Sequence, residues 1–372
     1  MPPLTLLIKP ASSLCNLSCR YCFYHSIAEN RSIQNFGLMS PALLEKLVKK
    51  ALHYADEVCT FAFQGGEPTL TGLDFYRLLL ELQRKYNSKN VQIFNTLQTN
   101  GTLITEEWAC FFRENRFLVG LSLDGPNEIH DYHRIDAKGK GTFNRVINTA
   151  RLFGRYAVDF NILTVVNRQV ARHPAQVYQF FKRQGFRYLQ FIPCLDPLAE
   201  DPGAYPHSLS PDDYAHFLIT LFELWYQDLT RGDFFSIQMF DNWVEMIQGY
   251  PPEICGFSGI CSVSFVIEGN GNVYPCDFYA SDRWCLGNIT TSDFAALRET
   301  PLSRQFIESS KPVAPQCESC PWYGFCRGGC RRHREPFHEG KPVLNYFCAA
   351  HQRFFEHAWE KLRKVAEMAS KA

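Results

Sequence analysis

CNLSCRYC, residues 15–22, carries three cysteines, Cys15, Cys19 and Cys22, and the next cysteine in the chain is Cys59. Four thiolates would indicate a closed tetrahedral metal site, and two would indicate a redox pair or half of a zinc site. A four-iron cluster takes four ligands, so three cysteines leave one iron free to bind another molecule. The spacing therefore indicates a metal centre with one open position.

The chain around this loop alternates short β-rich runs with amphipathic helical stretches, a pattern typical of βα units and a parallel sheet. We predict helices near residues 40–55, 72–87, 105–115, 142–156 and 173–184, the first capped by Ser40 with Pro41 in its first turn. Strands are predicted at residues 4–10, 58–63, 91–97, 117–123, 158–166 and 186–192. Six such units favour an α/β fold with a partial (β/α)6 TIM-like barrel, although periodicity alone leaves a doubly wound sheet open.

Polar and glycine-rich segments follow these strands. The cysteine loop follows the first strand, QGGEP (64–68) the second and QTNG (98–101) the third. DGP (124–126) follows the fourth strand and CLDP (194–197) the sixth. In parallel barrels the chemistry lies beyond the carboxyl ends of the strands, so we expect the site at these loops.

The character of the chain changes near residue 250. We predict a barrel over residues 1–200 and a helical connecting segment over 201–250, with helices near 210–230 and 238–249. A cysteine-rich Fe-S cluster domain is predicted over 251–350, where GNGNVYPC forms a turn between two short strands, followed by a C-terminal helix over 351–372.

Charge and composition limit the function classes. Lys plus Arg and Asp plus Glu both number 38, and no basic run is present, so a nucleic-acid partner is not expected. The N-terminal segment lacks the pattern of a signal peptide, and no apolar run is long enough to span a bilayer. We therefore expect a cytoplasmic protein with no membrane association. In that reducing compartment the 15 cysteines favour metal binding over disulfides.

The cysteine loop resembles the signature of the radical S-adenosylmethionine enzymes, with Tyr21 in the aromatic place. The resemblance implies that Cys15, Cys19 and Cys22 hold a 4Fe-4S cluster and that its free iron binds S-adenosylmethionine. A zinc site completed by a distant His or Cys is the alternative that the spacing leaves open.

GGEP after the second strand also matches this family's pattern, which implies that Gly65, Gly66 and Glu67 bind the methionine amino group. Glycines allow close backbone approach, and a carboxylate can accept from an ammonium. Ser122 and Arg134 are further candidates for the cofactor's carboxylate. The alternatives are an ordinary turn at GGEP and a solvated loop arginine at Arg134.

The C-terminal cysteines form two possible sets of four. CESCPWYGFCRGGC resembles the SPASM auxiliary-cluster module, so the resemblance implies two more 4Fe-4S clusters and three in total. One would be held by Cys255, Cys261, Cys276 and Cys330, and the other by Cys317, Cys320, Cys326 and Cys348. Two structural zinc sites are the alternative, since the spacing suits them equally well. Cys59, Cys110, Cys194 and Cys285 are assigned no role.

The whole chain resembles the anaerobic sulfatase-maturating enzymes, through stretches such as FAFQGGEPTL, VGLSLDGP, YPCDFYA and CRGGCRR. The resemblance implies oxidation of a cysteine or serine side chain in a nascent sulfatase to formylglycine. A 5'-deoxyadenosyl radical from S-adenosylmethionine would abstract a β-hydrogen, and an electron would then pass to an auxiliary cluster. The implied partners are an unfolded sulfatase with a Cys/Ser-x-Pro-x-Arg motif and a donor such as flavodoxin or ferredoxin.

By the same resemblance Asp277, in YPCDF, is the catalytic base. Tyr24 and Gln98 are candidates for contacts to the peptide backbone, with loop packing as the alternative. Two other functions remain open: a SPASM enzyme that forms thioether or carbon–carbon links in a peptide, and a zinc-stabilised interaction protein without catalysis.

Overall fold

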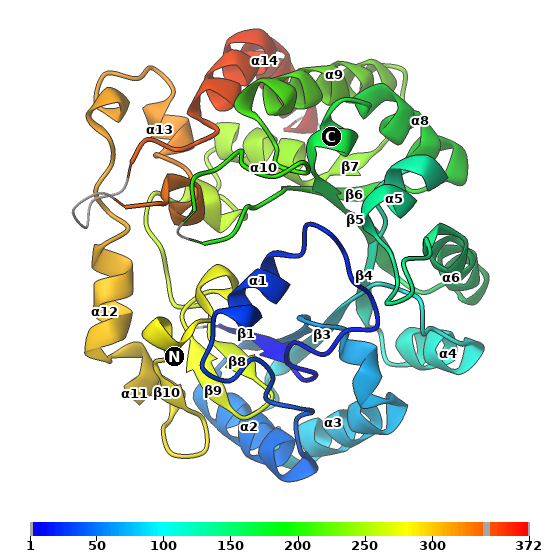
Figure 1. Cartoon of the computed structure of the whole chain (residues 1–372), viewed down its shortest axis with the longest axis vertical. Coiled ribbons are helices and arrows are strands. Elements are labelled where there is room, and N and C mark those ends of the chain that lie inside the picture. The colour runs from blue at the N-terminus through cyan, green and yellow to red at the C-terminus, as the bar shows by residue number, and fades with distance from the viewer. Residues whose placement is uncertain (1–2, 199, 338–342, 371–372) are drawn as a thin grey trace. The chain divides into compact units, whose positions relative to one another are not determined.

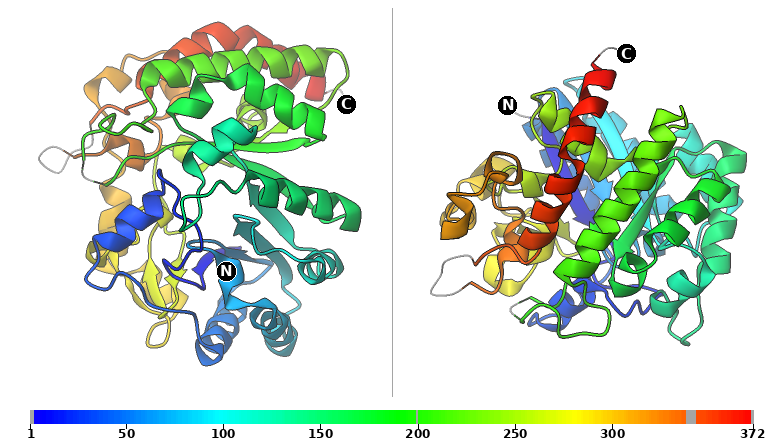
Figure 2. Two further views of the ribbon diagram at one scale, coloured as in Figure 1. Left: turned by 45° about the vertical axis from the view of Figure 1, so that its right-hand side comes forward. Right: turned by 90° about the horizontal axis from the view of Figure 1, so that it is seen from above.

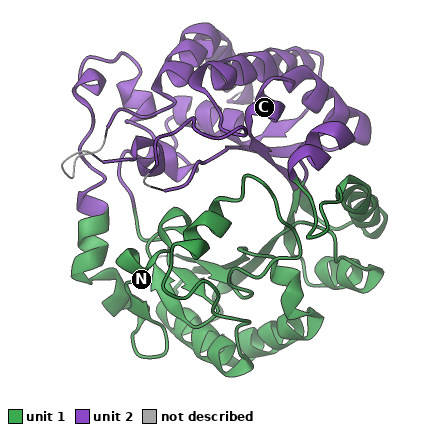
Figure 3. Ribbon diagram, viewed as in Figure 1, with its two compact units in different colours: residues 1–122, 134–160, 262–306 green, residues 123–133, 161–261, 307–372 purple. Residues whose placement is uncertain are grey.

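The computed structural model describes residues 3–198, 200–337 and 343–370. The chain divides into two compact units (Figure 3). Unit 1 comprises residues 1–122, 134–160 and 262–306, and unit 2 comprises residues 123–133, 161–261 and 307–372. The units therefore do not follow the linear order of the chain, because a late segment folds with the N-terminal part.

Unit 1 contains a mostly parallel sheet with strand order β10-β9-β8-β1-β2-β3-β4. Strands β1 to β4 are parallel, and β8 adds to the free edge of β1 in the same direction. Strand β9 pairs antiparallel with β8, and β10 pairs antiparallel with β9. Their bounds are β1 (Leu4–Lys9), β2 (Val58–Phe63), β3 (Gln92–Thr99), β4 (Leu118–Ser122), β8 (Val266–Glu268), β9 (Asn272–Tyr274) and β10 (Gly287–Asn288).

Helices follow the strands of unit 1 (Figure 1), and α2, α3, α4 and α6 among them were predicted from the sequence. They are α1 (Phe23–Glu29), α2 (Pro41–Tyr54), α3 (Leu73–Tyr86), α4 (Glu106–Glu114), α6 (Phe143–Tyr156), α11 (Phe294–Arg298) and most of α12 (Pro301–Glu308), with short 3₁₀ helices η1 (Pro68–Thr71), η3 (Asp277–Tyr279) and η4 (Asp282–Trp284). Ser40 caps α2 by accepting from the Leu43 backbone N–H at 3.2 Å, with Pro41 as the first helical residue. The predicted start of this helix is thus confirmed.

Unit 2 contains the parallel strands β5 (Phe160–Val166), β6 (Tyr188–Pro193) and β7 (Ser236–Ile237). Its helices are α5 (Asn127–His133), α7 (Arg168–Ala171), α8 (Pro174–Gln184), α9 (Pro211–Thr230), α10 (Gln238–Ile247), α13 (Tyr323–Cys326) and α14 (Cys348–Ala369), with η2 (Cys255–Phe257), η5 (Pro315–Cys317) and η6 (Arg331–Arg334). No helix in the described parts of the chain is long and apolar enough to cross a bilayer.

Aromatic packing holds the helices of unit 2 together. Helices α9 and α14 lie side by side (Figure 2). The ring of Phe354 on α14 stacks on Phe240 of α10 with centroids 5.9 Å apart, and packs edge-on to Phe222 of α9 at 5.5 Å. Phe222, Phe240 and Phe354 are fully buried, so this contact is the centre of an apolar core.

The six predicted strands and the helices that follow them are all present. The predicted turn between two short strands is also confirmed, since residues 269–271 connect the antiparallel strands β8 and β9. The pairing of β8 with β1 was not predicted. The helices that were not predicted are α1, α5, α7, α11, α12 and α13. Of the predicted C-terminal helix, residues 371 and 372 lie outside the described residues.

Candidate active site

The three-cysteine loop leaves the carboxyl end of β1 and leads into α1. Cys22 occupies the position before the first residue of α1, and its backbone N–H donates to Cys19 O at 3.2 Å. Cys15 and Cys22 are exposed and Cys19 is half-buried, so all three thiols are open to a ligand. Burial raises the pKa of Cys15 to about 11, and the charges of Glu67 and Cys22 act in the same direction. An added cation such as iron would therefore favour the thiolate form.

Gly65 and Gly66 bring the loop after β2 against the cysteine loop. Their φ angles are +90° and +56°, in the region that favours glycine. A Cβ on Gly66 would lie 2.2 Å from the backbone oxygen of Leu14, and one on Gly65 would lie 2.6 Å from the Lys9 side chain. Side chains at these two positions would therefore displace the cysteine loop or Lys9.

Glu67 joins the loops that follow β2 and β3. Its carboxylate is 1% exposed and accepts from the Thr69 backbone and hydroxyl, from Thr99 Oγ1 at 2.7 Å and from the Asn100 backbone N–H at 2.8 Å. Burial raises the pKa of Glu67, while these donors favour the charged form. The protein's own donors thus occupy this carboxylate, and through it the loops after β2 and β3 are joined.

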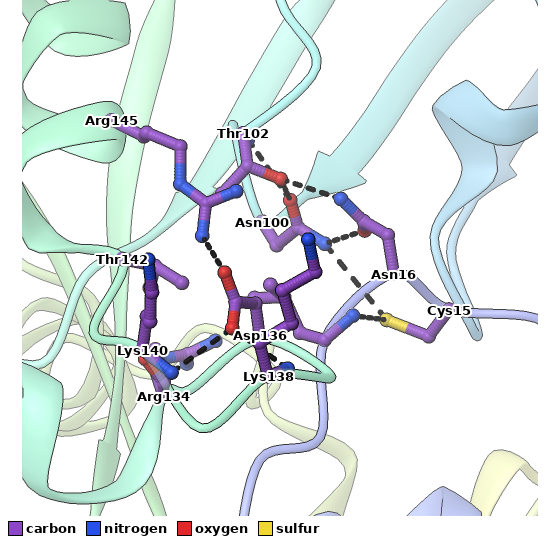
Figure 4. A network of polar contacts seen from close by, with 11 residues as sticks. Cys15, Asn16, Asn100, Thr102, Arg134, Asp136, Lys138, Lys140, Thr142 and Arg145 are labelled. Atoms are coloured by element: carbon purple, nitrogen blue, oxygen red, sulfur yellow. Dashed lines mark hydrogen bonds and ion pairs between the residues drawn. The ribbon is translucent and has the colours of Figure 1, made fainter.

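Asn100 connects β3 to the cysteine loop (Figure 4). Its side-chain amide donates to Asn16 Oδ1 at 2.8 Å and makes a longer contact of 3.9 Å to Cys15 Sγ. Asn16 in turn donates to Thr102 Oγ1 at 2.8 Å. The sequence analysis identified the QTNG segment but not Asn100 itself. Its position directly after a predicted strand was the available signal.

A tight turn holds the loop that carries Arg134 (Figure 4). Asp136 accepts from the backbone N–H groups of Lys138 and Lys140 at 3.0 Å and from the Arg145 guanidinium at 2.9 Å. The Ser18 backbone N–H donates to the carbonyl of Ile135 at 2.8 Å, which ties this loop to the cysteine loop.

The remaining predicted cofactor contacts lie in the same unit. The guanidinium of Arg134 lies over the Tyr21 ring, 5.5 Å from its centroid, and both side chains are buried. Ser122 Oγ accepts from Gln98 Nε2 at 3.0 Å. The structure thus brings Tyr21 together with Arg134 and Ser122 together with Gln98.

Asp277 is held by two residues that the sequence analysis did not identify. Lys9 Nζ, at the carboxyl end of β1, lies 2.5 Å from Asp277 Oδ1, and Gln64 Nε2 donates to Asp277 Oδ2 at 2.6 Å. Lys9 is fully buried, whereas the Asp277 side chain is 17% exposed. A lysine at the end of an otherwise apolar strand was the signal in the sequence.

Tyr24 supports this pair from one side. Its ring lies 3.7 Å from Lys9 Nζ, and its hydroxyl donates to Glu268, which also pairs with Arg31 at 2.9 Å. Burial, followed by the Glu268 charge, raises the pKa of Tyr24 well above its usual value. With 4% of its surface exposed, Tyr24 acts within the protein's own network, and contact with a peptide remains a prediction.

Four cysteines of unit 2 surround one cavity of about 220 Å³. Cys317, Cys320, Cys326 and Cys348 line it, together with His351 and Phe355. Thiols arranged around a space of this size fit a polynuclear cluster.

The second set of thiols divides between the units. Cys255, Cys261 and Cys330 belong to unit 2, and Cys276 belongs to unit 1 next to Asp277. Burial, followed by the charges of Cys255 and Cys261, raises the pKa of Cys330 to about 12. A Cβ on Gly256, the residue after Cys255, would lie 3.4 Å from Cys330 Cβ, so the chain at Cys255 packs against Cys330.

Two family models match the chain. Residues 10–181 match the radical SAM superfamily, and residues 255–321 match SPASM, an iron-sulfur cluster-binding domain. A cysteine-type anaerobic sulfatase-maturating enzyme of Clostridium perfringens (strain 13 / Type A) is 52% identical over 98% of this chain and 99% of its own length. The chain belongs to the anaerobic sulfatase-maturating enzymes.

Other relatives and a solved structure agree with this family. A serine-type anaerobic sulfatase-maturating enzyme of Bacteroides thetaiotaomicron is 34% identical, over 95% of this chain and 89% of that protein. The structure described as native anSMEcpe with bound AdoMet and Cp18Cys peptide has a TM-score of 0.95 and 50% identity, and covers 99% of this chain and 100% of that chain. The predicted radical SAM partial barrel with a C-terminal SPASM domain is confirmed. The zinc-stabilised interaction protein has no support.

Proposed function

We propose that this anaerobic sulfatase-maturating enzyme oxidises a cysteine side chain in a sulfatase polypeptide to Cα-formylglycine. The observation that carries the proposal is the Asp277 carboxylate, fixed between Lys9 and Gln64 in the residue after Cys276. A carboxylate held in this way has a fixed direction from which to take a proton. The 52% identity to a cysteine-type relative supports cysteine, and a serine substrate is the second form to be tested.

Cys15, Cys19 and Cys22 are the proposed ligands of the first 4Fe-4S cluster. S-adenosylmethionine bound there would supply the radical chemistry that removes a hydrogen atom from the cysteine β-carbon. Gly65 and Gly66 present backbone oxygens to the methionine amino group, and Glu67 fixes that loop. Tyr21, Ser122 and Arg134 complete the proposed pocket, in which the Arg134 fork suits the methionine carboxylate.

Asp277 then accepts the thiol proton from the substrate cysteine. The side chain has by this point lost one hydrogen atom from carbon and one proton from sulfur, and it gives up one electron to form a thioaldehyde. Water replaces the sulfur and releases hydrogen sulfide, which leaves the aldehyde. Lys9 keeps Asp277 oriented, and Gln98 and Tyr24 are proposed to lie near the peptide.

Two auxiliary 4Fe-4S clusters are proposed to receive the electron. Cys317, Cys320, Cys326 and Cys348 would hold one, and the cavity that they line supports this set. Cys255, Cys261, Cys276 and Cys330 would hold the other. A reduced flavodoxin or ferredoxin is the proposed electron donor, and the proposed location is the cytoplasm, where unfolded sulfatase is available.

Comparison of wild-type protein with Asp277→Asn tests this proposal. Both proteins are incubated without oxygen with a cysteine peptide bearing the Cys-x-Pro-x-Arg motif, dithionite and S-adenosylmethionine. We expect the variant to release 5'-deoxyadenosine but to form at least a hundredfold less aldehyde, since general base catalysis contributes about 10²–10⁴-fold. An equal loss of both products would argue against Asp277 as the base.

A further inference from the structure

Arg334 is a buried cation for which the structure shows no carboxylate partner. It lies in η6, four residues after Cys330, and is 2% exposed. Among residues 3–198, 200–337 and 343–370, no acidic side chain lies within ion-pair distance of its guanidinium. A charge buried in this way is costly unless an anion balances it. The buried guanidinium therefore requires a negative partner other than a carboxylate.

The guanidinium binds the main chain that connects the two sets of cysteines in unit 2. Its Nη2 donates to Ser310 O and its Nη1 to Pro312 O, both at 2.8 Å. The Ser310 hydroxyl accepts from the Cys261 backbone N–H at 2.9 Å. The same segment continues to η5, which ends at Cys317. Arg334 thus positions a backbone segment that contacts Cys261 and leads to Cys317.

Arg334 also lies beside the chain that joins one cysteine of each set. Its Nη1 is 3.9 Å from the position that a Cβ on Gly328 would take, and Gly328 stands between Cys326 and Cys330. Backbone carbonyls carry only partial charge, so Ser310 and Pro312 do not balance a full cation. The groups that can balance it are thiolates and the clusters that they would hold.

We infer that Arg334 is the shared positive counter-charge of the two auxiliary iron–sulfur centres and favours their reduced forms. This inference rests on the cluster ligation proposed above. An electron taken from the substrate would add one negative charge to the accepting cluster. A nearby fixed cation stabilises the more negative state, because net charge and local hydrogen bonds set the potentials of such clusters.

The test compares Arg334→Gln, which removes the charge, with Arg334→Lys, which keeps it. Arg353→Gln is the control, since Arg353 is an exposed arginine of unit 2 that pairs with Asp212 at 2.7 Å. The full chain is used with Cys15, Cys19 and Cys22 replaced by alanine, so that only auxiliary clusters contribute to the spectrum. Iron per protein is measured by elemental analysis, and the reduced fraction by electron paramagnetic resonance in an anaerobic redox titration.

At a fixed potential we expect Arg334→Gln to lower the ratio of reduced to oxidised cluster about tenfold, which is about 59 mV for a one-electron couple. Arg334→Lys and Arg353→Gln should keep the parental ratio. An unchanged ratio in Arg334→Gln would overturn the inference. So would equal iron loss in the Gln and Lys variants, because charge would then not be the property that matters. If the parent protein itself held no auxiliary iron, the proposed ligation would fail instead.

Discussion

At Gly66 the backbone turns with φ +56° directly beneath the Leu14 carbonyl, which its Cβ would approach to 2.2 Å. We predict that Gly66→Ala displaces the cysteine loop and lowers 5'-deoxyadenosine release at least tenfold. Gly37 is a matched control, because it has φ +75° with open space around its Cβ position. Gly37→Ala should cost only about 1–2 kcal/mol of backbone strain and retain cleavage. Equal activity of the two variants would contradict the close-approach argument.

Lys9 and Asp277 form a pair whose coupling can be measured. Breaking a buried ion pair costs about 3–5 kcal/mol, and the lower end applies here because the Asp277 side chain is 17% exposed. Lys9→Met should therefore lower the free energy of unfolding in urea by about 3 kcal/mol. The double variant with Asp277→Asn should lose less than the sum of the two single variants. Additive losses would show that the pair is not coupled.

At the scale of elements, the sequence predicted most of what local signals control. Ser40 and Pro41 mark the start of α2, and apolar runs mark β1 to β6. Helix α1 was missed because it follows the cysteine motif without a side-chain cap or an acidic first turn. In the site, Lys9, Gln64 and Asn100 were missed because their roles depend on partners distant in sequence.

The contact between α10 and α14 offers a test at this scale. Phe354 is fully buried between Phe240 and Trp243, whose ring centroids lie 5.9 and 4.6 Å from its own. Phe354→Ala should destabilise the protein by about 3–5 kcal/mol through the cavity that it leaves. Met368→Ala, on the same helix but 50% exposed, should change stability by less than about 0.5 kcal/mol. Thermal unfolding of both variants gives the comparison.

At the scale of the whole molecule, the C-terminal part of the sequence completes the sheet of the N-terminal part. Strand β8 pairs with β1 from Leu7 to Lys9 and thereby covers the edge of the strand that leads into the cysteine loop. This pairing joins residues more than 250 positions apart, so no local pattern could predict it. The sequence analysis placed a boundary near residue 250, whereas residues 262–306 pack in unit 1.

A truncation follows from this arrangement. A chain that ends at residue 250 keeps Cys15, Cys19 and Cys22 but lacks β8, so we expect it to lose bound iron and cleavage of S-adenosylmethionine. The full chain with Cys317, Cys320, Cys326 and Cys348 replaced by alanine is the control, and it should still cleave the cofactor. A truncated chain as active in cleavage as the control would show that β8 is dispensable for the first site.

The most direct measurement uses a sulfatase-derived peptide whose target cysteine carries deuterium on the β-carbon, beside an unlabelled serine version. Each peptide is incubated without oxygen with the iron-loaded protein, dithionite and S-adenosylmethionine, and the products are analysed by mass spectrometry. The account predicts an aldehyde at the cysteine position and deuterium in the 5'-deoxyadenosine. Unlabelled 5'-deoxyadenosine with both peptides intact would contradict the proposed oxidation and point to another peptide substrate.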